Sequence, residues 1–148
     1  MNWISRTVSV VLVAVLLLLG SAGESTALSV SAASAVLMDA ESGRVLYEHN
    51  AHTPMLIAST TKIMTALTAL RHYDLGETVT VSREAALTEG SSMYLKEGEQ
   101  LTVEELLYGL LLASGNDASE ALACHCGDRE RFVGWMNEIA AEIGMSDS

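Results

Sequence analysis

A serine and a lysine in this sequence stand at the spacing that nucleophilic catalysis requires. Ser59 and Lys62 lie in Ser59-Thr60-Thr61-Lys62, at the start of a segment with helical periodicity. On a helix this spacing places both side chains on one face, within reach of each other. A serine hydroxyl becomes an effective nucleophile when a neighbouring group takes its proton, and a lysine that is desolvated or near other cations can do so. The free N–H groups at a helix start would also stabilise developing negative charge.

The same four residues have a structural interpretation. Ser59 could cap the helix that follows, while Lys62 extends into solvent one turn later. Both residue types are common, so the Ser-x-x-Lys pattern also arises by chance. Considered by itself, the tetrapeptide favours this structural interpretation.

A second polar element, Ser114-Gly115-Asn116, directly follows an apolar segment. Ser114 and Asn116 could both project from it into a cleft beside a core. Alternatively, Asn116 caps the next helix and Ser114 forms a local turn bond. Considered by itself, this element also favours the structural alternative.

Periodicity and turn residues indicate which elements position these two motifs. Residues 35–39 and 45–48 are short apolar runs that flank Ala40-Glu41-Ser42-Gly43, which predicts a β-hairpin. Residues 60–72 have apolar side chains on one helical face, which predicts a helix. Residues 79–81 could form a short strand, and residues 91–100 a loop or small hairpin.

Three more helical segments are expected. Thr102 and Glu105 have the spacing of a capping box, so a helix should begin there. Residues 106–112 are apolar on nearly every side, which predicts that this helix is buried centrally. A segment follows from residue 117 to about residue 124. Asp128 is expected to cap a last helix, and Gly144 to end it.

Together, the two polar motifs resemble one known family. The chain contains one Ser-x-x-Lys and one Ser-x-Asn, in the order and approximate separation found in penicillin-recognising serine acyl-transferases. Residues 58–67 and 110–118 resemble the corresponding segments of the D-alanyl-D-alanine carboxypeptidases, the low-molecular-mass penicillin-binding proteins. The hairpin at residues 36–47 and the segment 132–137 also resemble that family. The resemblance runs from about Ala35 to Met145, nearly the whole chain after its first thirty residues.

The resemblance implies a fold and a reaction. The fold would be an α/β (α+β) domain of the β-lactamase/transpeptidase type, in which an antiparallel sheet packs against helices. The reaction would remove the terminal D-alanine from peptidoglycan stem peptides ending in D-Ala-D-Ala, through an acyl-enzyme. Ser59 would attack the penultimate carbonyl and Lys62 would accept its proton. Ser114 would relay a proton to the leaving group, and Asn116 would bind the substrate amide. β-Lactams would acylate Ser59, and the family needs neither a metal nor a cofactor.

Two departures from the family pattern affect these expectations. The family has a third motif, Lys-Thr-Gly, which binds the substrate carboxylate; here the Lys-x-Gly is Lys96-Glu97-Gly98, which precedes Ser114 and carries an unsuitable negative charge. We therefore expect residues 33–148 to be the N-terminal half of a peptidase domain, inactive by itself. Ile57 stands where the family usually has proline, and we expect a small effect, because isoleucine can adopt the extended conformation that proline would impose.

Two other functions remain open at this stage. A class A-like β-lactamase would share Ser59 and Lys62, but it usually has Ser-Asp-Asn where this chain has Ser-Gly-Asn, and the chain has no Glu-x-x-Leu-Asn deacylation motif. A non-catalytic exported binding module could keep the helical part of the family without its reaction.

The N-terminal residues resemble a secretory signal peptide. Residues 1–6 carry one positive charge, residues 7–20 are almost unbroken Val, Leu and Ala, and small residues follow. This pattern predicts a signal peptide at residues 1–32; the alternatives are an uncleaved anchor and a buried core helix. The protein should then act at the extracytoplasmic face of a bacterial membrane, in the cell wall or in the periplasm. By the resemblance, membrane association would need the family's C-terminal part.

Composition excludes several kinds of partner. The chain has 148 residues, enough for one small domain after removal of the signal peptide. Eight scattered basic residues against nineteen acidic ones give a net charge of −11, which excludes nucleic acid as a partner. Two cysteines are too few for a disulfide scaffold. In Cys124-His125-Cys126 the thiols would point to nearly opposite sides of a helix, so we expect no metal site.

Overall fold

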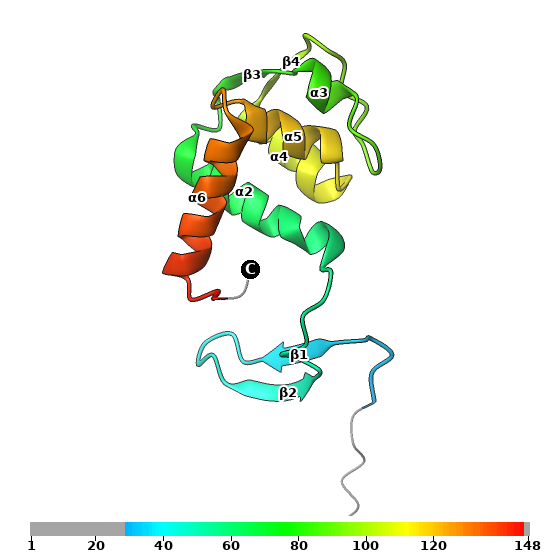
Figure 1. The fold of residues 1–148 in the computed structure, drawn as a ribbon, viewed down its shortest axis with the longest axis vertical. Helices are drawn as coiled ribbons and strands as arrows, with labels where there is room; N and C mark the ends of the chain where they lie inside the picture. The colour runs from blue at the N-terminus through cyan, green and yellow to red at the C-terminus, as the bar shows by residue number, and fades with distance from the viewer. Residues whose placement is uncertain (1–28, 147–148) are drawn as a thin grey trace, which may run out of the picture. The chain divides into compact units, whose positions relative to one another are not determined.

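The computed structural model describes residues 29–146, which divide into two units, one before and one after the Pro54–Met55 bond. The first unit contains the strands β1 (Ala35–Met38) and β2 (Val45–His49), which pair antiparallel (Figure 1). This confirms the predicted hairpin. Of the signal peptide expected at residues 1–32, residues 1–28 lie outside the described residues.

The turn of the hairpin is held by one carboxylate. Asp39 Oδ1 accepts hydrogen bonds from the backbone N–H of Ser42, at 2.8 Å, and from the Ser42 hydroxyl. These bonds hold the pKa of the Asp39 carboxyl below its usual value. Gly43 has a φ of +69°, which other residues rarely adopt, so the turn requires glycine there.

The second unit is mainly helical and contains one further pair of short strands (Figure 1). Its elements are the 3₁₀ turn η1 (Ala58–Thr60), α2 (Thr61–His72), β3 (Thr78–Thr80), α3 (Arg83–Ala86), β4 (Gln100–Thr102), α4 (Val103–Leu112), α5 (Asn116–Cys124) and α6 (Arg129–Glu142). The predicted helix at residues 60–72 is confirmed. The expected short strand lies one residue earlier than predicted, and β4 pairs antiparallel with it.

A capping box begins α4, as predicted. Thr102 Oγ1 accepts from the Glu105 N–H at 3.2 Å, and Glu105 Oε2 accepts from the Thr102 N–H at 2.8 Å. The bonds from the Thr102 backbone and side chain also lower the pKa of the Glu105 carboxyl. Two backbone donors at the helix start are thereby satisfied.

The prediction that α4 is buried on nearly every side is wrong. One face, with Leu106 and Leu110, lies in the core, but Tyr108 is 60% exposed and Leu112 is 81% exposed. The helix packs against α2 and α5 on that one face. An apolar composition on every side does not show which side other elements will cover.

The core of this unit lies among α2, α4, α5 and α6, with residues of β3 and α3. Phe132 on α6 is completely buried, and its ring lies near those of Tyr73 and Trp135, with ring centroids 6.1 Å away in both cases. As predicted, Asp128 caps α6 by accepting from the Glu130 N–H at 2.9 Å. Among residues 29–146, no helix has the length and apolar character needed to cross a membrane.

Removing the capping hydroxyl should destabilise the helical unit. We expect Thr102→Ala to lower the free energy of unfolding by about 1 kcal/mol, since Ala cannot accept from the Glu105 N–H. Thr102→Ser keeps a hydroxyl that can accept this bond, and it should stay close to the unsubstituted protein. Urea unfolding followed by circular dichroism measures both variants. Equal losses in the two would show that the bond has no role in stability.

Candidate active site

The chain enters α2 through a strained turn that presents Ser59. Ala58 has a φ of +47°, an uncommon value for a residue other than glycine. Ile57 has a φ of −92° and a ψ of 2°, so it does not adopt the extended conformation on which the expected small effect of this departure rested. Its carbonyl accepts from the N–H and the hydroxyl of Thr60, and this local turn explains the difference. Ser59 is exposed and makes no capping bond to α2, so the capping interpretation is also wrong.

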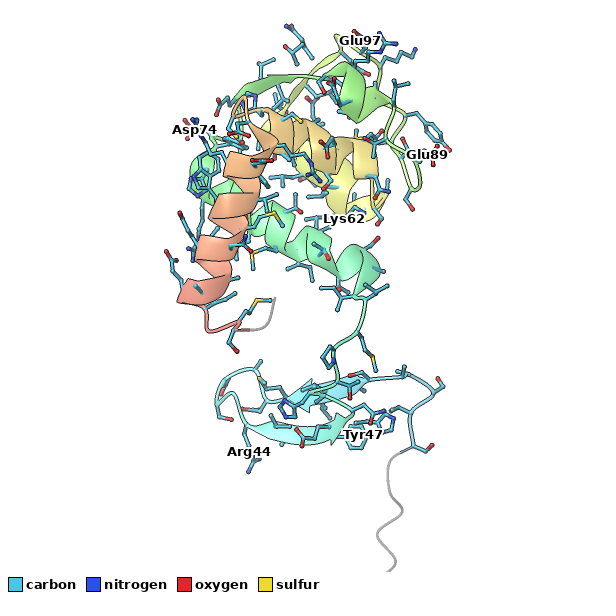
Figure 2. All side chains as sticks on the ribbon, in the orientation of Figure 1. Arg44, Tyr47, Lys62, Asp74, Glu89 and Glu97 are labelled. Carbon is cyan, nitrogen blue, oxygen red and sulfur yellow. The ribbon has the colours of Figure 1, made fainter. Side chains whose placement is uncertain are left out.

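Lys62 is buried, although it lies only one turn into α2. Its side chain extends between α2 and the helices α4 and α5 (Figure 2), and the residue is only 9% exposed. Lys62 Nζ donates hydrogen bonds to Ser59 Oγ at 3.3 Å and to Asn116 Oδ1 at 2.6 Å. The interpretation of Lys62 as a solvated lysine is therefore wrong. The structure brings together the two motifs that the sequence separates by 54 positions between Lys62 and Asn116.

Asn116 is held in one orientation by backbone groups of the segment 87–99. Its Nδ2 donates to Glu89 O at 2.7 Å, and its backbone N–H donates to Ser91 O at 2.7 Å. The N-cap of α5 is Gly115 rather than Asn116, so the capping interpretation of Asn116 is wrong. Glycine at position 90 lets the backbone of the segment approach the Asn116 side chain, because a Cβ there would lie 2.5 Å from Asn116 Nδ2.

Ser114 lies beside these residues in the sequence but makes none of their hydrogen bonds. Its φ is +54°, and its Oγ is buried. Among the described residues, Ser114 Oγ is the buried side-chain oxygen that has no hydrogen-bond partner. A buried hydroxyl without a partner costs about 1–3 kcal/mol. The structure therefore joins Ser59, Lys62 and Asn116 directly and leaves Ser114 unbonded.

The sequence analysis missed Asp117, which is 1% exposed. Its carboxylate accepts hydrogen bonds at 2.6–3.1 Å from the Ser92 hydroxyl and from the backbone N–H groups of Met93, Leu95 and Ala118. Burial raises the pKa of the Asp117 carboxyl, but these hydrogen bonds outweigh burial and hold the pKa below its usual value. The available signal was an acidic residue directly after the polar motif and before an apolar helical face.

Gly115, between Ser114 and Asn116, is required by the packing around Asp117. A Cβ at this position would lie 2.8 Å from Asp117 Oδ1 and 3.3 Å from Gly109 O. The middle residue of the second motif thus has a steric reason to be glycine. Its φ of −63° is ordinary, so the requirement comes from space and not from backbone conformation.

The side chains of Cys124 and His125 interact with neighbouring carboxylates. His125 Nε2 lies 2.9 Å from Glu77 Oε1, and the Cys124 thiol donates to Glu120 Oε1 at 3.4 Å. Burial, followed by the bond to Glu120, raises the pKa of the Cys124 thiol to about 11. Within residues 29–146, no three His, Cys, Asp or Glu side chains form a group that could hold a metal ion.

This arrangement can support nucleophilic chemistry at Ser59. The hydroxyl is exposed, so a substrate can reach it, and a buried amine lies within hydrogen-bond distance. Both acceptors of Lys62 are uncharged oxygens, and no carboxylate pairs with Lys62 in the described part of the chain. The site therefore places an exposed hydroxyl beside an amine that no ion pair occupies.

Comparison with known proteins gives the context for this geometry. The family model for D-alanyl-D-alanine carboxypeptidase matches residues 21–148. D-alanyl-D-alanine carboxypeptidase DacF of Bacillus subtilis is 42% identical over 123 residues, which cover 79% of this chain and 32% of the relative. The chain thus spans about a third of the length of this curated relative.

Solved structures agree in fold. A D-alanyl-D-alanine carboxypeptidase from Mycobacterium tuberculosis H37Rv matches with a TM-score of 0.78 and 35% identity, covering 84% of this chain and 47% of that one. A mutant of the Streptomyces K15 DD-transpeptidase matches with a TM-score of 0.75 and 33% identity, covering 82% of this chain and 52% of that one. These similarities confirm the predicted transpeptidase-like α/β fold and the family resemblance.

Acid should weaken the contribution of Asp117 to stability. Its pKa is lower in the folded chain than in the unfolded chain, so the unfolded chain binds a proton first as pH falls. The contribution is therefore complete above the ordinary aspartate pKa of about 3.9 and decreases as pH falls through the folded pKa. We expect Asp117→Asn to cost about 2 kcal/mol at pH 7 and less at pH 3.

Urea unfolding at a series of pH values measures this difference. Asp128→Asn is the matched control, because asparagine replaces aspartate well as a helix cap. Its stability should follow that of the unsubstituted protein at every pH. If the cost of Asp117→Asn stays constant from pH 7 to pH 3, the carboxylate bonds do not produce the acid sensitivity.

Proposed function

Because the chain belongs to the D-alanyl-D-alanine carboxypeptidase family, we propose that it carries the nucleophile side of a serine-type carboxypeptidase site. The substrate would be peptidoglycan stem peptides that end in D-Ala-D-Ala. One observation carries this proposal: the buried Lys62 amine lies between Ser59 Oγ, at 3.3 Å, and Asn116 Oδ1, at 2.6 Å. This geometry gives an exposed hydroxyl a proton acceptor and gives that acceptor a fixed position.

In the proposed reaction, Ser59 Oγ attacks the carbonyl carbon of the penultimate D-alanine. The neutral Lys62 amine accepts the hydroxyl proton across the contact that it already makes. A C–O bond forms, the C–N bond to the terminal D-alanine breaks, and the proton taken up by Lys62 passes to the nitrogen of the leaving group. Water then attacks the ester carbonyl and gives a proton to Lys62. The ester C–O bond to Ser59 breaks, the shortened peptide leaves as its carboxylic acid, and Lys62 returns the proton to Ser59 Oγ.

The position of Lys62 supports its role as the proton acceptor. A base must lie within hydrogen-bond distance of the proton that it takes, and Lys62 Nζ lies 3.3 Å from Ser59 Oγ. The Lys62 side chain lies between α2 and the two helices α4 and α5, and its bond to Asn116 Oδ1 fixes the amine there. A second cation beside it would come from the lysine of the family's Lys-Thr-Gly motif, which these 148 residues do not contain.

Asn116 and Ser114 would serve the substrate and the leaving group. Asn116 Nδ2 uses one hydrogen on Glu89 O and retains a second that can donate to a substrate carbonyl. The buried Ser114 hydroxyl has no partner among the described residues and could accept and donate one proton in the relay to the leaving nitrogen. A hydroxyl already committed to another bond would be less available for this transfer.

We further propose that the protein acts outside the cytoplasm, on the peptidoglycan itself. Export would use the signal peptide expected at residues 1–32, and β-lactams would acylate Ser59 in place of the peptide substrate. The reaction is proposed for a site completed by the rest of the family's domain, since the chain spans about a third of the length of DacF. By itself, the 148-residue chain should react only slowly.

A fluorescent penicillin tests the nucleophile. We expect it to label Ser59 in a chimera in which this chain replaces the matching third of Bacillus subtilis DacF. Peptide mapping by mass spectrometry locates the adduct. Ser59→Ala should abolish labelling because the nucleophile is lost, whereas Ser119→Ala, a serine substitution within α5, should leave labelling unchanged. An adduct on another residue would contradict the assignment.

The same chimera separates the other functions. Rapid turnover of penicillin without an accumulating adduct would identify a β-lactamase. Absence of any adduct, while DacF itself is labelled under the same conditions, would identify a binding module without catalysis. A stable adduct combined with release of D-alanine from a stem peptide supports the carboxypeptidase.

Lys62→Arg tests the proton acceptor. Arginine has roughly the same reach, but it stays protonated at working pH and cannot act as a base. We expect the second-order rate constant of Ser59 acylation to fall by at least ~10²-fold in the chimera, the lower range for loss of a general base. Stopped-flow measurement with a chromogenic β-lactam gives this rate. A rate close to that of the unsubstituted chimera would rule out Lys62 as the base.

A further inference from the structure

The segment 87–99 crosses the start of α5 and is tied there by two consecutive residues. Asn116 donates to two of its carbonyls, and Asp117 accepts from three of its donors. The positions bonded are Glu89, Ser91, Ser92, Met93 and Leu95. The first part of the segment thus orients Asn116, and the part that follows is held by the Asp117 carboxylate.

Asp117 fixes a part of this segment that would not hold its conformation unaided. Tyr94 has a φ of +64°, which is rare for a bulky residue and costs about 1–3 kcal/mol. The N–H groups on both sides of it, those of Met93 and Leu95, donate to Asp117. The Tyr94 N–H donates to Ser92 Oγ, whose own hydroxyl donates to Asp117. All three bonds around the strained residue therefore depend on one buried carboxylate.

We propose that Asp117 is the positioning residue that directs Asn116 Oδ1 toward Lys62. It does so by holding the segment whose Glu89 and Ser91 carbonyls orient Asn116. The catalytic meaning of this inference rests on the proposed function, but the structural relation does not. Asp117 itself touches neither Ser59 nor Lys62 in any hydrogen bond of the described residues.

The orientation of the Asn116 side-chain amide decides whether its oxygen or its NH₂ group faces the Lys62 amine. As observed, Nδ2 donates to Glu89 O and Oδ1 accepts from Lys62 Nζ. A half-turn of the amide would place an NH₂ group against the amine of Lys62 and an oxygen against the carbonyl of Glu89. The Asn116 oxygen would then face the oxygen of the Glu89 carbonyl, and these are two acceptors with no hydrogen between them. The Glu89 carbonyl selects the productive orientation only while the segment stays in place.

Nuclear magnetic resonance of the ¹⁵N-labelled chain tests this directly. In Asp117→Asn, we expect amide hydrogen exchange at Asn116 and Leu95 to rise at least about tenfold more than exchange in α6, which reports the loss of overall stability. The two Asn116 side-chain N–H signals should also shift and broaden, since the amide no longer has a single orientation. Ser92→Ala removes one bond to the carboxylate and should act in the same direction more weakly. It serves as the test if Asp117→Asn does not fold.

Asp128→Asn is the control, with the same loss of charge at the start of another helix, and it should leave the Asn116 signals unchanged. Unchanged Asn116 side-chain signals in both Asp117→Asn and Ser92→Ala would overturn the inference. It would also be overturned if exchange at Asn116 rose only as much as exchange in α6, since Asp117 would then only stabilise the fold.

The reaction provides a separate readout in the chimera with DacF. Asp117→Asn should lower the maximal rate of Ser59 acylation by between about 10- and 100-fold, with a smaller change in the half-saturating concentration of β-lactam. Unchanged acylation would overturn the catalytic part of the inference. If the unsubstituted chimera did not acylate at all, the proposed function would fail, and the resonance data would still decide the role of Asp117.

Discussion

The contact between Lys62 Nζ and Asn116 Oδ1, at 2.6 Å, joins α2 to α5 and is the interaction on which the candidate site depends. It requires a charged or ionisable side chain to leave water at the start of α2, and such a group is tolerated there only with fixed polar partners. Small side chains allow the close packing: Ala66 and Ala69 of α2 are buried in the core beside α4 and α5. The same helix, α2, thus provides both the small side chains of the packing and the buried amine of the site.

The orientation of Asn116 in turn depends on backbone groups rather than on other side chains. Carbonyls of the segment 87–99 accept from it, and the buried Asp117 carboxylate accepts from that segment. Backbone groups move only with the segment as a whole, so a few hydrogen bonds fix several positions together. Gly90 and Gly115 complete this arrangement, because a Cβ at either position would collide with Asn116 or Asp117.

The sequence predicted the local features of this structure more fully than the long-range ones. Helix starts at Thr102 and Asp128 follow from capping chemistry within three residues, and the pairing of Ser59 with Lys62 follows from helical spacing. The bond from Lys62 to Asn116 was not predictable from spacing, since it depends on how α2 packs against α5. The same holds for the exposed outer side of α4 and for the burial of Asp117.

Strain and unsatisfied polarity in this unit concentrate around the candidate site. Ala58 precedes Ser59 with a positive φ, Ser114 combines a positive φ with a buried hydroxyl that lacks a partner, and Tyr94 has a positive φ in the segment that orients Asn116. Such features persist only where surrounding contacts over-determine them. The capped helices α4 and α6 and the buried Phe132 lie in the same unit and provide that stability. A fold selected for stability alone would have no reason to place strained residues around a buried lysine. A site that must present a hydroxyl, an amine and an amide to one substrate has such a reason.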